Sequence, residues 1–225
     1  MRGGAGLRSS ARASRRILPE ALIENRQFRY RLLRRRDLPP ETIEMSRFLI
    51  GKILVRDHPD GRASGRIVET EAYPPGDAAG HAFRGETAAR RSLFLGPGHG
   101  YVYMAYGSCY CFNVSSEPAG IGAGVLIRAL EPLEGIAIMQ RRRGTETLRD
   151  LARGPGRLAT ALVIERDLDG VDLCVKGPLW LATASLPTDA IARSVRIGIP
   201  REAHHLRRFY ERGPYVSGTR RLNAG

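Results

Sequence analysis

Two carboxylates and a tyrosine alternate along a short segment that is typical of a β-strand. Glu69, Glu71 and Tyr73 belong to VETEAY, which continues the β-forming residues GRI without a helical period. Successive side chains of a strand point to opposite faces, so we expect these three to share one face of a half-buried strand. An acid pair in such a place needs a partner of opposite charge.

Arg128 is the natural candidate for that partner, because it stands inside the apolar strand pattern VLIRALEP. A buried guanidinium requires a carboxylate, and a neighbouring strand with Glu69 and Glu71 offers two. Two interpretations stay open on these residues alone. The ion pair could be purely structural, or it could hold and polarise a water molecule in a dry pocket.

Aromatic residues gather a little further along, where YVYMAYGSCY holds four of the eight tyrosines. Tyr101 and Tyr103 share strand parity, and Tyr106 has the opposite parity. Such a segment packs in a core, or it forms a platform for unstacked nucleic-acid bases. Asn113 in FNVSS is either a satisfied structural amide or a reader of base edges.

Composition limits the alternatives. The chain has 225 residues and a net charge of +13, and no apolar run approaches the 18 residues of a membrane helix. Three cysteines do not make a disulfide framework, so we expect a reduced, intracellular protein. The histidines and cysteines lack zinc-ligand spacing, so we predict no metal, and phosphate-binding loops of the Walker and GxGxxG types are absent.

Much of the charge lies in residues 1–36, which hold eleven arginines and two acids, a net of +9. Because this leader lacks hydrophobic periodicity, we expect it to be disordered. A solvated tail or an overlong start, a polyanion-binding arm and an Arg- and Ser-rich transit peptide all fit it. We assign residues 37–225 to one catalytic domain.

The remaining pattern predicts an α+β fold, a single domain with a curved, mostly antiparallel sheet and peripheral helices. Helices are expected over 39–49, 134–144 and within 153–164, and a long irregular loop over 74–92. Strands are expected over 52–57, 65–73, 101–115 with a hinge at Gly107, and 124–132, with a hairpin turn at Asp60-Gly61. Further strands are expected on both sides of Gly177-Pro178 and over 194–200.

Several long motifs resemble one known family. GRIVETEAY, YVYMAYG, CFNVSS, GVLIRALEPLEG and RFYERGPYVS occur in the order found in the alkyladenine DNA glycosylases, and the likeness runs from Leu38 to Ser217. The resemblance implies an enzyme that flips damaged purines out of duplex DNA and hydrolyses the N-glycosidic bond, leaving an abasic site. Its substrates would be 3-methyladenine, 7-methylguanine, hypoxanthine or ethenoadenine.

The resemblance also implies residue roles. Glu71 would be the general base that activates water, Arg128 would position that water, and the Val216 carbonyl would be a third contact. Glu69 would lie outside the water site. Tyr73, His81 and Tyr103 would sandwich the flipped base, Asn113 would bar guanine through its 2-amino group, and Tyr106 would wedge into the minor groove.

We expect the contacts to DNA to come from Thr87, Ser108, Arg157 and Ser217 together with Tyr106. Here the sequence departs from the family: the arginines of residues 87–92 are shifted, the loop before His81 is one residue shorter than in the animal enzymes, and Ser108 replaces a bulkier apolar residue. Lys52 and Lys176 lie outside the motifs, which predicts a monofunctional glycosylase that uses water rather than a Schiff base.

The remaining expectations concern partners. The resemblance implies damaged double-stranded DNA as partner, no membrane, no cofactor, a monomer, and a cytoplasmic, nucleoid-associated location if the protein is bacterial. Two other classes of protein predict different sequences. A non-catalytic binder on the same fold would lack the acid at 71 or the arginine at 128, and a nucleoside hydrolase would need neither Tyr106 nor the basic flanks.

Overall fold

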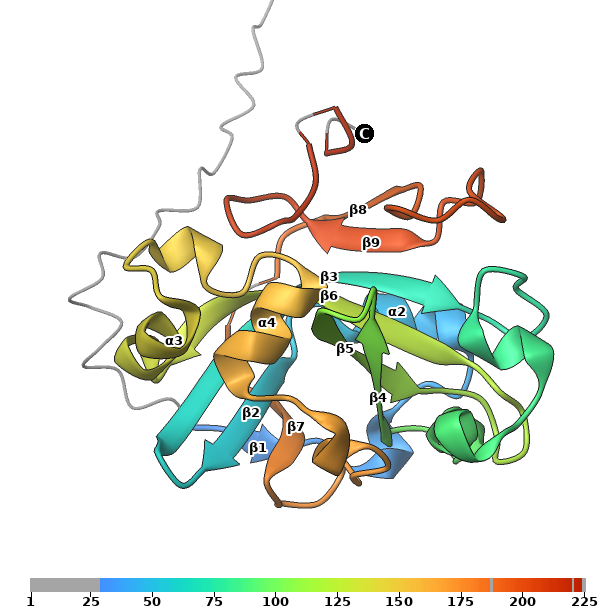
Figure 1. Cartoon of the computed structure of the whole chain (residues 1–225), viewed down its shortest axis with the longest axis horizontal. Helices are drawn as coiled ribbons and strands as arrows, with labels where there is room; N and C mark the ends of the chain where they lie inside the picture. Colours follow the sequence, from blue (N-terminus) through green and yellow to red (C-terminus); the bar gives the residue numbers. More distant parts are fainter. Residues whose placement is uncertain (1–28, 187, 220, 224–225) are drawn as a thin grey trace, which may run out of the picture.

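One antiparallel sheet organises the molecule. The computed structural model describes residues 29–186, 188–219 and 221–223. Within them, nine strands form a sheet in the order β1-β7-β2-β3-β6-β5-β4, and β9 joins β3 and carries β8 (Figure 1). Every pairing between these strands is antiparallel, and the helices lie outside the sheet, so the predicted α+β class is confirmed.

The elements have the following bounds. The strands are β1 (Arg31–Leu32), β2 (Ile53–His58), β3 (Gly61–Tyr73), β4 (Gly100–Ala105), β5 (Cys109–Ser115), β6 (Gly124–Glu134), β7 (Leu179–Thr183), β8 (Ile191–Ser194) and β9 (Arg208–Glu211). The α-helices are α2 (Thr42–Leu49), α3 (Ile136–Arg143) and α4 (Pro155–Leu162). Short 3-10 helices are η1 (Arg35–Asp37), η2 (His81–Arg84), η3 (Ala88–Phe94), η4 (Leu148–Asp150) and η5 (Arg166–Leu168).

Strand β3 is the axis of the fold. Along one edge it pairs with β6. The other edge is shared, with β2 on residues 61–66 and β9 on residues 69–71. Because strands and helices surround it, residues 63–72 are all buried. The expectation of a half-buried strand was therefore wrong, since the alternation of polar residues here reflects buried ion pairs and not a solvent face.

The register between β3 and β6 breaks where the charged residues lie. Glu69 faces Ala129 and Thr70 faces Ile127, so Arg128 has no direct partner across the strands. Such an irregularity re-aims side chains and increases local twist. It leaves Arg128 within reach of both Glu69 and Glu71.

Helices cover the sheet where apolar residues recur on one face. Helix α2 packs on β3 with Met45 and Leu49 fully buried, and Ser46 hydrogen-bonds Thr70 at 2.9 Å between hydroxyls. Helix α4 packs on β5 through a similar apolar stripe, as expected from residues 153–164. The described residues contain no helix long and apolar enough to cross a membrane.

The tyrosine-rich segment folds into a hairpin. Strands β4 and β5 pair up to Ala105 and Cys109, and the turn between them places Tyr106 at φ 53° and Gly107 at φ 66°. Two successive residues with positive φ are typical of the type I′ turn that suits the twist of a hairpin. The hinge predicted at Gly107 is therefore present as a tight turn.

Three sequence expectations differ from the structure. Residues 195–200 are not a strand, because β8 ends at Ser194. Only one strand, β7, forms around Gly177-Pro178, and Asp172 makes just an isolated bridge to His99. Residues 29–36, counted with the leader, contain β1, which pairs with β7, and the buried Leu33. Apolar Leu32 and Leu33 join the sheet despite the flanking arginines, while residues 1–28 lie outside the described residues.

Candidate active site

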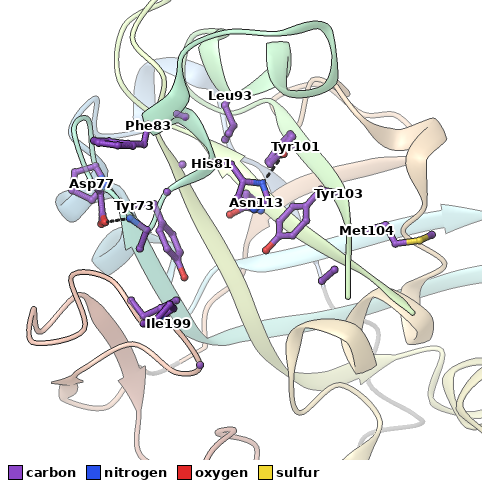
Figure 2. Close-up of a pocket in the computed structure, with 18 of the residues that line it drawn as sticks. Tyr73, Asp77, His81, Phe83, Leu93, Tyr101, Tyr103, Met104, Asn113 and Ile199 are labelled. Atoms are coloured by element: carbon purple, nitrogen blue, oxygen red, sulfur yellow. Dashed lines mark hydrogen bonds between the residues drawn. The ribbon is translucent and has the colours of Figure 1, made fainter. Parts of the chain in front are cut away.

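A cavity of about 360 Å³ opens beside the C-terminal end of β3. The sequence-predicted residues Tyr73, His81, Tyr103, Asn113 and Tyr106 all line it, although they come from β3, η2, β4, β5 and the hairpin turn. Figure 2 shows Tyr73 on one side and His81 with Tyr103 on the other. The arrangement leaves a slot between aromatic rings.

Ring contacts fix one wall of this slot. The His81 and Tyr103 ring centroids are 4.1 Å apart, and Tyr103 stacks on Tyr101 at 5.5 Å. His81 Nδ1 and the Tyr101 hydroxyl lie 2.8 Å apart in a hydrogen bond (Figure 2). Partial burial and the nearby Arg90 lower the pKa of His81, which favours the neutral form of the ring. The sequence grouped Tyr101 with Tyr103 in a possible aromatic platform, but the resemblance gave Tyr101 no role, and the structure places it in the lining.

Asn113 brings an unsatisfied donor to the pocket. The residue is 6% exposed, and its Nδ2 atom has no hydrogen-bond partner among the described residues. Buried amide groups are nearly always paired. Because Asn113 lines the cavity, this unpaired Nδ2 is a candidate donor to an acceptor on a bound molecule.

The rim of the pocket carries exposed apolar side chains. Tyr106 is 92% exposed, and Phe83 and Met104 are each 53% exposed, although all three line the cavity. Figure 2 shows Met104 pointing away from the labelled rings. Sequence analysis missed Phe83 and Met104, for which strand and loop patterns gave no functional signal.

Glu71 lies behind the pocket and does not line it. Its carboxylate is fully buried and accepts three contacts: the Tyr73 hydroxyl donates to Oε2 at 2.9 Å, the Ile197 amide donates to Oε1 at 2.7 Å, and Arg128 Nη1 approaches Oε1 at 3.3 Å. Tyr73 therefore connects the pocket directly to a buried acid. The predicted partnership between Arg128 and the acids of VETEAY is confirmed.

Glu69 is the centre of a second, tighter network. Its Oε1 accepts from Arg128 Nε at 2.9 Å and Arg208 Nε at 2.7 Å, and the Ser217 amide donates to Oε2 at 2.7 Å. Burial alone would raise the pKa of Glu69, but Arg128 and Arg208 outweigh it and hold this pKa below its usual value. Arg128 is thereby held in place by an acid that stays charged.

The expected DNA contacts are distributed unevenly. Thr87, Ser108 and Arg157 are exposed, and Arg157 pairs with Asp150 at 3.1 Å. Ser217 is instead buried, and its hydroxyl binds Glu69 at 2.9 Å, so the structure places it in the acid network and not on the surface. Val216 is buried beside it.

One group of described residues could offer three ligands to a metal ion. Glu202, His204 and His205 have ligand atoms within 4.8 Å of one another, and His205 Nε2 lies 2.7 Å from a Glu202 oxygen. His204 is exposed, and none of the three lines the pocket. The group adds nothing to the chemistry of the aromatic slot.

Comparison with known proteins defines the class. A family model described as methylpurine-DNA glycosylase (MPG) matches residues 37–214. The chain therefore belongs to the methylpurine-DNA glycosylase family, which confirms the resemblance seen in its sequence. It is a DNA glycosylase of the DNA repair type.

Curated relatives agree with this assignment. A protein of Mesorhizobium japonicum is 64% identical over 189 residues, covering 84% of this chain and 91% of the relative. A protein of Paraburkholderia phytofirmans is 50% identical over 191 residues, with 84% and 90% covered. A third, of Methanoculleus marisnigri, is 42% identical over 182 residues, with 79% and 94% covered. Each bears the name "Putative 3-methyladenine DNA glycosylase".

Proposed function

We propose that this protein flips alkylated or deaminated purines out of duplex DNA and hydrolyses their N-glycosidic bond with a water molecule activated by Glu71. The observation that carries the proposal is the Glu71 carboxylate, fully buried one hydrogen bond behind Tyr73, which lines the aromatic slot. The names of the relatives support 3-methyladenine as one substrate. Hypoxanthine, ethenoadenine and 7-methylguanine belong to the same proposal.

The hydrogen bonds of Glu71 leave an acceptor position unused. Two carboxylate oxygens offer about four lone-pair positions. Tyr73 occupies one on Oε2, while Ile197 and Arg128 share Oε1. A free position on Oε2 can accept a proton from water as its oxygen bonds to C1′ and the purine leaves with the electrons of the glycosidic bond. Arg128, fixed by Glu69, keeps a positive charge beside the water.

The slot supplies recognition of the base. Tyr73 on one side and His81 with Tyr103 on the other can stack on both faces of a flat purine. Electron-rich rings favour a cationic alkylated base. Asn113 offers its free Nδ2 to the base edge and excludes the 2-amino group of guanine. Tyr106, nearly fully exposed, fills the gap that the flipped nucleotide leaves in the duplex.

The same proposal covers the remaining expectations. Neither Lys52 nor Lys176 lines the pocket, which supports water as the nucleophile and a monofunctional enzyme without lyase activity. No cofactor enters the proposed reaction. We propose a monomer that works on damaged duplex DNA, and in a bacterium its place would be the cytoplasm, at the nucleoid.

Single-turnover release of base tests the proposal. Duplexes carrying one hypoxanthine or one ethenoadenine, beside methylated duplex, are mixed with excess protein. The wild type should release base, and Glu71→Gln should bind the lesion but lose release by about 100-fold or more. Glu146→Gln, an exposed acid outside the pocket, serves as the control and should match the wild type. Tight binding without release by the wild type would instead identify a non-catalytic lesion binder.

A further inference from the structure

A buried ion pair adjoins the aromatic slot: Asp77 lines the cavity, and Arg196 does not. Asp77 and Arg196 both have side chains that are 0% exposed. Arg196 donates through Nη1 to Oδ2 of Asp77 and through Nη2 to Oδ1 at 3.2 Å, and Arg207 adds a bond to Oδ2 at 2.8 Å. Burial alone would raise the pKa of Asp77, but bonds from Arg196 and the Ala79 amide hold it below its usual value. The acid is therefore a fixed counter-ion.

Arg196 contacts the slot from behind. Its guanidinium carbon lies 4.5 Å from the centroid of the Tyr73 ring, and its Nη1 donates to the Ala72 carbonyl at 3.0 Å. Tyr73 lines the cavity and Arg196 does not. The guanidinium therefore covers the ring face turned away from the cavity, and the other face remains available to a base. A planar guanidinium is well suited to stacking on an aromatic ring.

The same arginine anchors the segment that binds Glu71. The amide of the next residue, Ile197, donates to Glu71 Oε1 at 2.7 Å, and Gly198, Ile199 and Pro200 then line the cavity. One buried side chain thus fixes the ring that stacks on the base, the β3 backbone at Ala72, and the donor that orients the acid.

We propose that Arg196, with Asp77 as its counter-ion, is a positioning residue that holds the Tyr73 ring and the Glu71 carboxylate in the mutual geometry needed for excision. The inference rests on the proposed function and deepens it. Arg196 does not touch the substrate and acts through Tyr73 and Glu71. Misplacement of reacting groups by about 1 Å can cost about 100-fold in rate, so the pair is expected to affect catalysis more than DNA binding.

A double-mutant cycle with Tyr73 separates positioning from general stability. Single-turnover rate constants for ethenoadenine release are measured for the wild type, Arg196→Met, Tyr73→Ala and the double variant, below their unfolding temperatures. Arg196→Met should lower the rate constant by about 10- to 100-fold, and affinity for an abasic duplex should change by less than about threefold. In the double variant, the fold-loss in the rate constant should be at least about threefold smaller than the product of the two single fold-losses. The reason is that both substitutions act through the Tyr73 ring.

Two further variants complete the test. Arg196→Lys keeps the charge beside Asp77 but lacks the planar fork, so it should also slow release, and it replaces Arg196→Met if that variant does not fold. Arg66→Met removes another buried arginine, paired with Glu131 and Glu211 away from the slot. This control should lower stability and leave the rate constant unchanged.

The outcomes distinguish failure of the positioning inference from failure of the proposed function. Wild-type rates in both Arg196 variants, or losses in the cycle that simply multiply, overturn the positioning role. If the wild type itself releases no base, the proposed function fails. If release depends on Glu71 but not on Arg196, only the positioning inference fails.

Discussion

At the scale of single residues, the polar atoms around the slot differ in whether they are already satisfied. Glu69 and Glu71 have partners on both carboxylate oxygens. The Nδ2 of Asn113 has none among the described residues, although the side chain is buried. Partners on each oxygen fix the position of a carboxylate, whereas a polar atom without a partner is available to bind a ligand. Asn113 is therefore the clearest candidate for discrimination between purines.

Replacing Asn113 should change selectivity more than stability. Asn113→Ala removes a donor that makes no bond in the free protein, so the free energy of unfolding should change by about 1 kcal/mol or less. Release of 7-methylguanine relative to ethenoadenine should rise about tenfold, because the obstacle to a 2-amino group is gone. Urea unfolding and single-turnover release measure the two effects. A large loss of stability with unchanged selectivity would make Asn113 a structural amide.

Sequence patterns located some residues of the site and not others. Strand alternation grouped Glu69 and Glu71 with Tyr73 on one face, because period-two spacing fixes the face to which a side chain points. The family resemblance then supplied their roles. Strand alternation could not find the Asp77–Arg196 pair, whose members are 119 residues apart and lie on irregular segments. Spacing rules do not reach across such a distance. The sequence even suggested a strand at Arg196, where the chain instead bends along the slot.

At the scale of elements, the β4–β5 hairpin determines where the exposed tyrosine stands. Its turn has two residues with positive φ, one of them a non-glycine, Tyr106. The sequence predicted the hinge, since Gly107 is the residue that tolerates such a backbone. It did not predict the register break opposite Arg128, because bulges depend on packing between strands that are distant in sequence.

Gly107→Ala tests the hairpin directly. A Cβ at this position would meet nothing within 4 Å, so its cost is confined to the left-handed backbone, about 1 kcal/mol of unfolding free energy. Gly144→Ala is a matched control, with φ 61° and equally open space at the end of α3. Both should lose similar stability in urea, but only Gly107→Ala should weaken binding to lesion duplex in a titration. Equal DNA affinities of the two variants would show that the turn does not position Tyr106 for contact with DNA.

At the scale of the whole molecule, distant segments meet at two groups of buried charges. The partners of Glu69 come from β6, β9 and the C-terminal segment, and Asp77 is paired with Arg196 after β8. Removing one charge from such a network leaves another buried without compensation, which is more damaging than loss of a surface pair. The buried charges therefore link the geometry around the slot to global stability.

Acid should unfold the protein through these carboxylates. The folded-state pKa values of Glu69 and Asp77 lie below the ordinary values of 4.5 and 3.8. The two acids therefore contribute fully to the free energy of unfolding above those ordinary values, and this contribution is lost as the pH falls through the folded-state values. Urea unfolding between about pH 7 and about pH 3 should show a falling free energy of unfolding. Glu69→Gln should start less stable and show a shallower dependence. An equal slope in that variant would exclude Glu69 as a source of the effect.

The shared edge of β3 has a consequence for biosynthesis. Glu69 and Glu71 leave the ribosome early, yet Ile197, Arg208 and Ser217, which hold them, are made more than a hundred residues later. Until then this edge of β3 lacks β9, and the two acids lack much of their shell. The nascent chain therefore carries these two acids without their partners. Translation must pass Ser217 before the hydrogen bonds around Glu69 can be complete.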